Sequence, residues 1–187
     1  MSIRKVTLVT FTTILVISIA YFVGIKAGTY FKEKELFSNR KQNTRHILAK
    51  MDNLKIGITI PNYTFEDLSF QLVELQTIIT QSKTMLIFIE PSCHTCIEDL
   101  ERLSKIIESE DDAAHFIIIS SGNPRHLMDI RANLDIKIPI LYDHEQGYSS
   151  IFGVFTFPFH IVIDEKRIVK NIISGQLTDK EIYILLN

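Results

Sequence analysis

The chain has little cysteine. Its 187 residues include two, Cys93 and Cys96. A framework of several disulfides, which holds many small secreted domains together, is therefore excluded. Two cysteines are also too few for a zinc site with four cysteine ligands inside one chain. The pair is either a working unit or a coincidence of sequence.

Other features are missing as well. Tryptophan is absent, and the formal net charge is only −2. No broad basic region indicates a nucleic-acid partner, so we expect none. Internal repeats and low-complexity tracts are also lacking, and the length allows one domain of ordinary size plus an appendage.

The two cysteines lie in a Cys-His-Thr-Cys motif at residues 93–96, between two strong patterns. The apolar run Met85–Ile89 before it is typical of a central strand covered on both faces. After it, apolar residues recur every three or four positions and predict a helix from about Cys93 to Ser109. Cys93 then lies at a helix start, where unpaired N–H groups and the helix dipole favour a thiolate. This setting favours redox chemistry, and half a zinc site completed by histidines or an inert reduced pair are the alternatives.

An apolar segment lies near the N-terminus. Val6–Ile25 carries no charged residue and is rich in Ile, Val, Phe and Leu. A helix crosses the hydrocarbon core of a bilayer with about 20 apolar residues. We therefore expect residues 1–25 to be a transmembrane signal anchor. The alternatives are a buried core helix and a cleaved signal peptide, because Ser18–Ala20 has the small-x-small form of a cleavage site.

The polar residues 26–54 are expected to form a stalk or linker, and residues 55–187 a folded domain. Basic residues occur on both sides of the apolar segment, so charge does not set its orientation. We expect a single-pass protein of the cell membrane with its domain on the extracytoplasmic side. This expectation depends on the redox motif and on the usual insertion of short N-terminal anchors.

The domain alternates apolar patterns with the periods of strands and helices. Further strands are expected near Tyr63–Glu66, Phe70–Val73, Phe116–Ile119 and Ile138–Leu141, and a hairpin from Phe159–Ile163 and Ile168–Ile173. Further helices are expected around Leu75–Ile79, Leu127–Leu134 and Asp179–Leu186, the last with Thr178 as its N-cap. This order predicts an α/β domain with a mixed sheet and helices on both faces.

Three segments carry a resemblance to a known family. They are the entry segment Gly57–Leu68, the segment Phe88–Cys96 with its Phe-x-x-Pro-x-Cys-x-x-Cys form, and Tyr148–Asp164 around Pro158. Together they resemble the membrane-anchored thioredoxins of the TlpA, ResA and MauD kind, from about residue 56 to the C-terminus. The resemblance implies a thioredoxin-like fold. It also implies an enzyme that exchanges thiols and disulfides with no cofactor beyond its own redox-active disulfide.

The resemblance assigns roles to four residues. Cys93 is expected to be the nucleophile and Cys96 the thiol that resolves the mixed disulfide. Pro158 is expected to be cis and to pack beside the sulfurs. Phe157 before it is expected to bind an extended substrate through its backbone. No metal ligand is implied.

The chain departs from the family pattern at three places. Ser92 precedes the first cysteine where many members have Trp, and Ile87 stands where thioredoxin has a buried Asp. His94 and Thr95 form the pair between the cysteines, where relatives often have a proline. These differences leave the redox direction open.

Three polar residues have two interpretations each. His94 either stabilises the Cys93 thiolate when protonated or faces solvent. Asp99 either accepts a proton from Cys96 or is a dipole partner in the first turn of the helix. His160 either completes a copper set with both cysteines or is satisfied by a neighbouring strand, and we favour the second interpretation.

These observations predict a membrane-tethered thiol-disulfide oxidoreductase that acts on protein disulfides or dithiols outside the cytoplasm. By analogy with the family we expect a reductant, with a membrane protein as a possible electron donor. Two other classes stay open. One is a copper chaperone that uses both cysteines and a histidine. The other is an anchored interaction module in which the cysteines play no part.

Overall fold

The computed structural model describes residues 20–28, 31, 54–79, 83–109 and 115–186. Contacts divide the chain into two compact units, residues 1–43 and 44–187. In the first unit, residues 20–28 are helical. None of the helices in the described ranges is long and apolar enough to cross a bilayer. Residues 1–19 of the expected anchor and most of the expected stalk lie outside these ranges.

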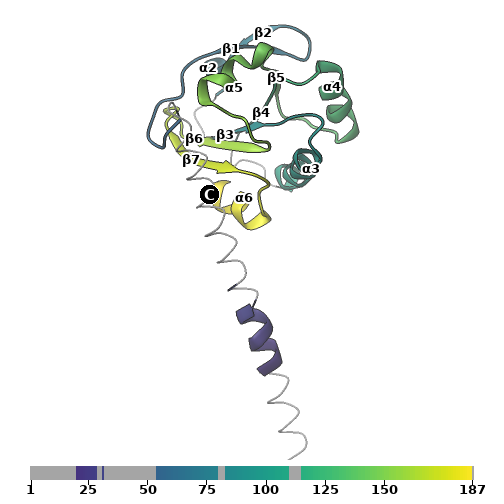
Figure 1. The fold of residues 1–187 in the computed structure, drawn as a ribbon, viewed down its shortest axis with the longest axis vertical. Coiled ribbons are helices and arrows are strands. Elements are labelled where there is room, and N and C mark those ends of the chain that lie inside the picture. The colour runs from purple at the N-terminus through teal and green to yellow at the C-terminus, as the bar shows by residue number, and fades with distance from the viewer. Residues whose placement is uncertain (1–19, 29–30, 32–53, 80–82, 110–114, 187) are drawn as a thin grey trace, which may run out of the picture. The chain divides into compact units, whose positions relative to one another are not determined.

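The second unit is built on a seven-stranded sheet in the order β2-β1-β5-β4-β3-β6-β7 (Figure 1). Strands β3, β4 and β5 run parallel in its centre, whereas the outer strands pair antiparallel with their neighbours. The mixed sheet that the sequence predicted is thus confirmed. The strands are β1 Thr64–Asp67, β2 Leu72–Glu74, β3 Thr84–Phe88, β4 His115–Ser120, β5 Ile140–Tyr142, β6 Phe159–Ile163 and β7 Val169–Ser174.

Helices cover both faces of the sheet, as the sequence predicted. The helices are α2 Leu75–Ile78, α3 His94–Ser109, α4 Pro124–Asn133, α5 Gly147–Phe152 and α6 Asp179–Leu186. Apolar residues of α3, α4 and α6 enter one core cluster, and those of α2 and α5 enter the other. Strand β3 supplies both clusters, since Leu86 and Phe88 belong to one and Met85 and Ile87 to the other. Both faces of β3 are therefore buried, which explains its unbroken apolar run.

One helical segment is absent from the sequence-based prediction. The 3-10 turn η1, His144–Gln146, leads directly into the short helix α5. Asp143 before it accepts the N–H groups of Tyr148 and Ser149, each at 2.8 Å, and the Ser149 hydroxyl at 2.7 Å. The Tyr148 and Phe152 side chains are buried in the core. A buried cap and two aromatic anchors stabilise this helix, so it needs no long apolar period.

Helix α6 begins as the sequence predicted. Thr178 Oγ1 accepts the Glu181 N–H at 3.3 Å, and Glu181 Oε2 accepts the Thr178 N–H at 2.7 Å. This reciprocal capping box fixes the start of the helix. Leu177, which directly precedes this helix start, is fully buried. Its backbone N–H contacts Asp99 on the inner face of α3.

Candidate active site

The two cysteines lie where β3 has ended and α3 begins. Cys93 N–H donates to the Glu90 carbonyl at 2.9 Å, and α3 starts at the next residue. Cys93 and Cys96 form a disulfide, with their Cα atoms 5.2 Å apart. Cys93 is partly exposed, whereas Cys96 is fully buried. A sulfur that arrives from solvent therefore reaches Cys93 first.

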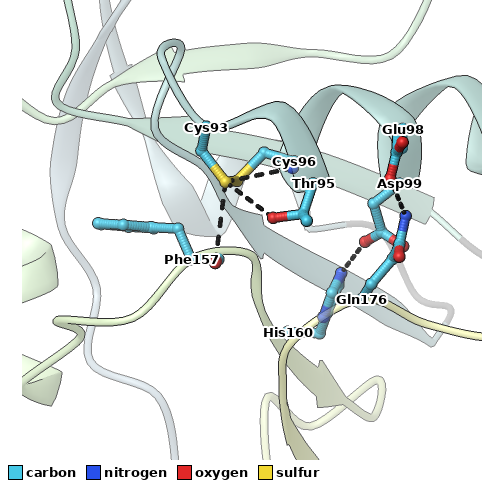
Figure 2. The surroundings of a disulfide bond; sticks show 8 residues. All are labelled: Cys93, Thr95, Cys96, Glu98, Asp99, Phe157, His160 and Gln176. Carbon is cyan, nitrogen blue, oxygen red and sulfur yellow. Dashed lines mark hydrogen bonds and ion pairs between the residues drawn. A yellow bond between two sulfur atoms is a disulfide. The ribbon is translucent and has the colours of Figure 1, made fainter.

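Two donors surround the exposed sulfur (Figure 2). Cys93 Sγ lies 3.2 Å from the backbone N of Cys96 and 3.2 Å from the Thr95 hydroxyl. Both groups can hydrogen-bond a thiolate at Cys93 once the disulfide is reduced, in addition to the field of the helix start. The sequence analysis assigned no role to Thr95. The available signal was a hydroxyl two positions after a cysteine at a helix start.

His94 faces solvent, with 86% of its side chain exposed. Its Nε2 atom lies 3.2 Å from Glu98 Oε1, an i,i+4 pair on the surface of α3. Within the described residues, no hydrogen bond joins the His94 ring to either sulfur. The solvent-facing interpretation is the one that the structure favours.

A segment distant in sequence completes the site. The peptide bond between Phe157 and Pro158 is cis, as the resemblance implied. The Phe157 carbonyl oxygen lies 3.8 Å from Cys93 Sγ (Figure 2). Strand β6 begins directly after Pro158, so the sheet positions this segment. The backbone of Phe157 therefore lies beside the sulfur that solvent can reach.

The loop after β4 packs against the segment that carries the cysteines. Gly122 lies so close to Pro91 that a Cβ atom built on it overlaps the proline ring. Only glycine leaves room for the ring at this position. The contact holds the loop between β3 and α3 in place.

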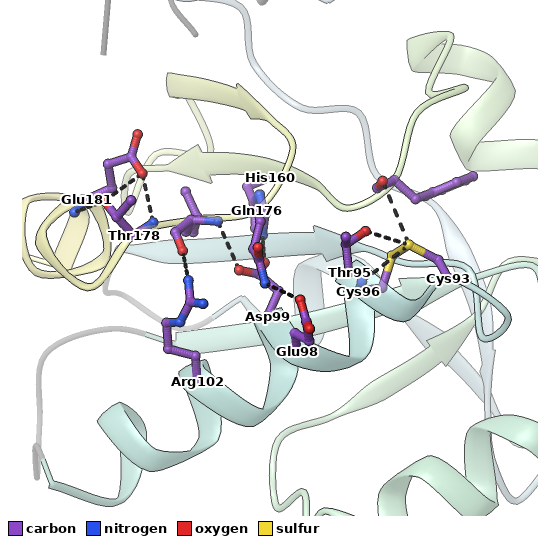
Figure 3. A network of polar contacts seen from close by, with 12 residues as sticks. Cys93, Thr95, Cys96, Glu98, Asp99, Arg102, His160, Gln176, Thr178 and Glu181 are labelled. Carbon is purple, nitrogen blue, oxygen red and sulfur yellow. Dashed lines mark hydrogen bonds and ion pairs between the residues drawn. A yellow bond between two sulfur atoms is a disulfide. The ribbon is translucent and has the colours of Figure 1, made fainter. Parts of the chain in front are cut away.

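The inner face of α3 carries a buried polar pair (Figures 2 and 3). Asp99 Oδ2 and His160 Nε2 are 2.8 Å apart, and neither side chain is exposed. Asp99 Oδ1 accepts the Leu177 N–H at 2.9 Å. Asp99 follows Cys96 by three residues, and both are fully buried. At this helical spacing, Cβ atoms lie about 5–6 Å apart.

Two interpretations from the sequence are therefore wrong. Asp99 is not an acid in the exposed first turn of α3, because it is buried and contacts the Leu177 N–H and the His160 ring. His160 is not satisfied by a neighbouring strand. It pairs in register with Ile87 on β3 and Ile173 on β7, which have no polar side-chain atoms. Its partner lies on the helix above the sheet.

The cysteines and His160 do not come together as a metal site. In the ranges that the structure describes, no group of three or more His, Cys, Asp and Glu side chains is arranged to hold a metal ion. The His160 Nε2 atom is hydrogen-bonded to Asp99 instead. No observation at this site favours copper delivery.

The protein is a thiol-disulfide oxidoreductase. Three features define this class: the thioredoxin-like fold, the Cys-x-x-Cys pair at a helix start and the cis-proline beside that pair. The chain belongs to the Redoxin family, whose sequence profile matches residues 55–184. That range spans nearly the whole domain that the sequence predicted.

One relative is the thioredoxin-like protein YneN of Bacillus subtilis (strain 168). It is 24% identical over 129 residues, which cover 67% of this chain and 75% of YneN. Among solved structures, StoA of Bacillus subtilis matches with a TM-score of 0.58 and 15% identity over 70% of this chain and 100% of StoA. A secreted Mycobacterium tuberculosis disulfide oxidoreductase homologous to E. coli DsbE matches with a TM-score of 0.59 and 14% identity, over 66% and 93% of the two chains. These structures support the fold.

Proposed function

We propose that this thiol-disulfide oxidoreductase is tethered to the cell membrane by residues 1–25 and exchanges its Cys93–Cys96 disulfide with extracytoplasmic proteins, as a reductant. The observation that carries the proposal is the asymmetry of the pair. Cys93 is partly exposed beside the Phe157 carbonyl, and Cys96 is fully buried. The Cys93 sulfur is accessible to a partner protein, and the Cys96 sulfur is accessible only to Cys93.

The first step takes place at Cys93 in the reduced protein. The Cys93 thiolate attacks a disulfide of the partner, a new S–S bond forms, and the partner's S–S bond breaks. One partner sulfur leaves as a thiolate and takes a proton from water. The backbone of Phe157 holds the partner chain in an extended form next to Cys93, which matches the position of its carbonyl 3.8 Å from Cys93 Sγ.

The second step takes place at Cys96. Its thiol loses a proton to Asp99, and its sulfur attacks Cys93 Sγ, so that the Cys93–Cys96 bond forms. The bond between Cys93 and the partner breaks, and the second partner sulfur leaves as a thiolate. The two protein thiols have lost two electrons, and the partner's disulfide has gained them.

Two considerations support the cellular setting. The charge-free segment Val6–Ile25 has the composition of a membrane anchor. One structural neighbour is described as a secreted disulfide oxidoreductase. The oxidised domain needs two electrons for another cycle, and we place their donor in the same membrane.

The test is a trapping experiment in cells with the full chain. Cys96→Ser removes the resolving thiol, so mixed disulfides with partner proteins should accumulate through Cys93. They appear as bands of higher mass that dithiothreitol removes, and the matched variant Cys93→Ser should show none. Equal amounts of such bands in the two variants would contradict the assigned roles.

The direction is tested by the reduction potential of the purified protein. A value near that of thioredoxin, about −270 mV, supports a reductant, and one near that of DsbA, about −120 mV, assigns an oxidant instead.

A further inference from the structure

Within the described residues, the buried carboxylate of Asp99 contacts one backbone N–H and one imidazole nitrogen, and no lysine or arginine. In the described structure its partners are His160 Nε2 at 2.8 Å and the Leu177 N–H at 2.9 Å. Burial disfavours the charged form of a carboxyl group, whereas hydrogen-bond donors to its oxygens favour that form. The donors therefore decide whether Asp99 can act as a base toward Cys96.

The second ring nitrogen of His160 indicates the protonation state of the ring. Nδ1 is buried and has no hydrogen-bond partner among the described residues. A doubly protonated ring would leave a buried N–H unpaired, which is costly. A lone pair on Nε2 would face a carboxylate oxygen and repel it. The favourable arrangement is a neutral ring with its proton on Nε2, directed at Asp99 Oδ2.

The other charged groups near the pair are engaged elsewhere (Figure 3). Arg102 on α3 donates to the Leu177 carbonyl and pairs with Asp179 on α6 at 3.4 Å. Glu98 pairs with His94 and accepts from Gln176, and Glu181 accepts from Thr178. On the sheet side, β3 and β7 place Ile87 and Ile173 in register with His160. Cys96 remains as the titratable group one turn along the inner face of α3.

We propose that His160 is a positioning residue for the thiol exchange: its Nε2–H donates to Asp99 and keeps that carboxylate ionised, ready to take the Cys96 proton. This inference rests on the function proposed above. The proton moves from the Cys96 sulfur to Asp99, directly or through one water, while the sulfur's electron pair forms the bond to Cys93. The ring itself gains and loses no proton. Asp99 afterwards returns the proton to solvent or to the departing thiolate.

The expected effect depends on the position of one donor. His160→Leu removes the Nε2–H donor to Asp99, so the carboxyl group of Asp99 should keep its proton. Release of a partner from Cys93 should then slow about tenfold near neutral pH. The rate should recover at higher pH, where Cys96 loses its proton without help. His160→Gln places an amide N–H close to the position of Nε2 and should restore most of the rate. His160→Asn is equally polar but too short to reach, and should resemble His160→Leu.

The experiment uses the full chain in detergent and the aromatic disulfide DTNB as the probe. The reduced protein releases one thionitrobenzoate when Cys93 is labelled and a second when Cys96 resolves the adduct. The second release is followed by stopped-flow absorbance as a function of pH in the native protein and the three variants. Slowing that is confined to lower pH in the Leu and Asn variants, with rescue by Gln, supports the proposal. Equal slowing at every pH without rescue by Gln, or no slowing in any variant, overturns it.

A second measurement does not depend on folding of the variants or on the proposed function. In the native oxidised protein, ¹⁵N chemical shifts should show a His160 ring with a proton on Nε2 and a bare Nδ1 throughout the neutral range. A doubly protonated ring, or a proton on Nδ1 alone, overturns the proposal. If no partner is trapped in cells while the DTNB and NMR results hold, the proposed cellular function fails and the role of His160 stands.

Discussion

At the scale of single residues, Thr95 is the side chain between the cysteines that reaches the exposed sulfur. Its hydroxyl is 3.2 Å from Cys93 Sγ, where it can donate to a thiolate. Thr95→Val removes this donor, so we expect alkylation of Cys93 near neutral pH to slow by about threefold. The reduction potential should become more negative, because the variant stabilises the reduced form less.

The matched control for this prediction is Thr95→Ser, which keeps the hydroxyl. Iodoacetamide kinetics and a glutathione titration of the potential measure both effects. Equal values for the Val and Ser variants would mean that the hydroxyl does not reach the thiolate in solution.

The sequence predicts the residues of the site unevenly. Cys93, Cys96 and Pro158 belong to local motifs, so their positions follow from spacing and from the resemblance. The bond between Asp99 and His160 joins side chains that lie 61 residues apart, on a helix and on a strand. No local pattern specifies it, because it depends on how α3 lies across the sheet. The apolar cross-strand neighbours of His160 exclude the partner that sequence reasoning preferred.

At the scale of elements, Asp164 organises the turn between β6 and β7. Its side chain pairs with Lys170 at 2.8 Å and accepts the N–H groups of Ile168 and Lys166, each at 2.9 Å. The bond to Lys170 and then these backbone bonds hold the pKa of Asp164 below its ordinary value. Such a carboxyl adds stability above its unfolded pKa of about 4 and loses that contribution as the pH falls through the lower folded value.

We therefore expect Asp164→Asn to be less stable than the native chain near neutral pH, and the difference to shrink as the pH falls below about 4. Urea unfolding midpoints of both proteins, measured near neutral pH and below pH ~4, give this difference in stability. The control is Glu165→Gln in the same turn, a side chain with no hydrogen bond or ion pair in the described structure, which should change little. If the stability difference between Asp164→Asn and the native chain stays constant with pH, the loss of stability comes from packing and not from the charge of Asp164.

Elements with strong local patterns are the ones that the sequence predicts well. The largely apolar β3 and the periodic α3 follow from their patterns, and α6 has the predicted bounds because its capping box is local. Helix α5 is missed since Asp143 and buried aromatic rings stabilise it. The apolar runs predict that the central strands are buried on both faces, but they do not predict the order of the strands in the sheet.

At the scale of the whole molecule, the proposed anchor is the feature that would determine where the chemistry occurs. If Val6–Ile25 spans the membrane, charges at its centre should prevent insertion, since each arginine there costs about 2.5–3.5 kcal/mol. We expect the double variant Leu15→Arg with Val16→Arg to lose the protein from the membrane fraction. Leu15→Ala with Val16→Ala is the control and should stay.

Carbonate extraction and immunoblotting of the two fractions measure this outcome. Retention of the arginine variant in the carbonate-washed membrane would show that another part of the chain holds the protein there. Release of a shortened native chain would instead identify a cleaved signal peptide.

The complete burial of Cys96 also bears on oxidative damage. In the reduced form we expect peroxide to oxidise the partly exposed Cys93 first, to a sulfenic acid. Cys96 is expected to condense with this sulfenic acid, which releases water and restores the disulfide ahead of the irreversible sulfinic stage. The buried thiol that we propose to release a partner protein would thus also protect the domain from overoxidation.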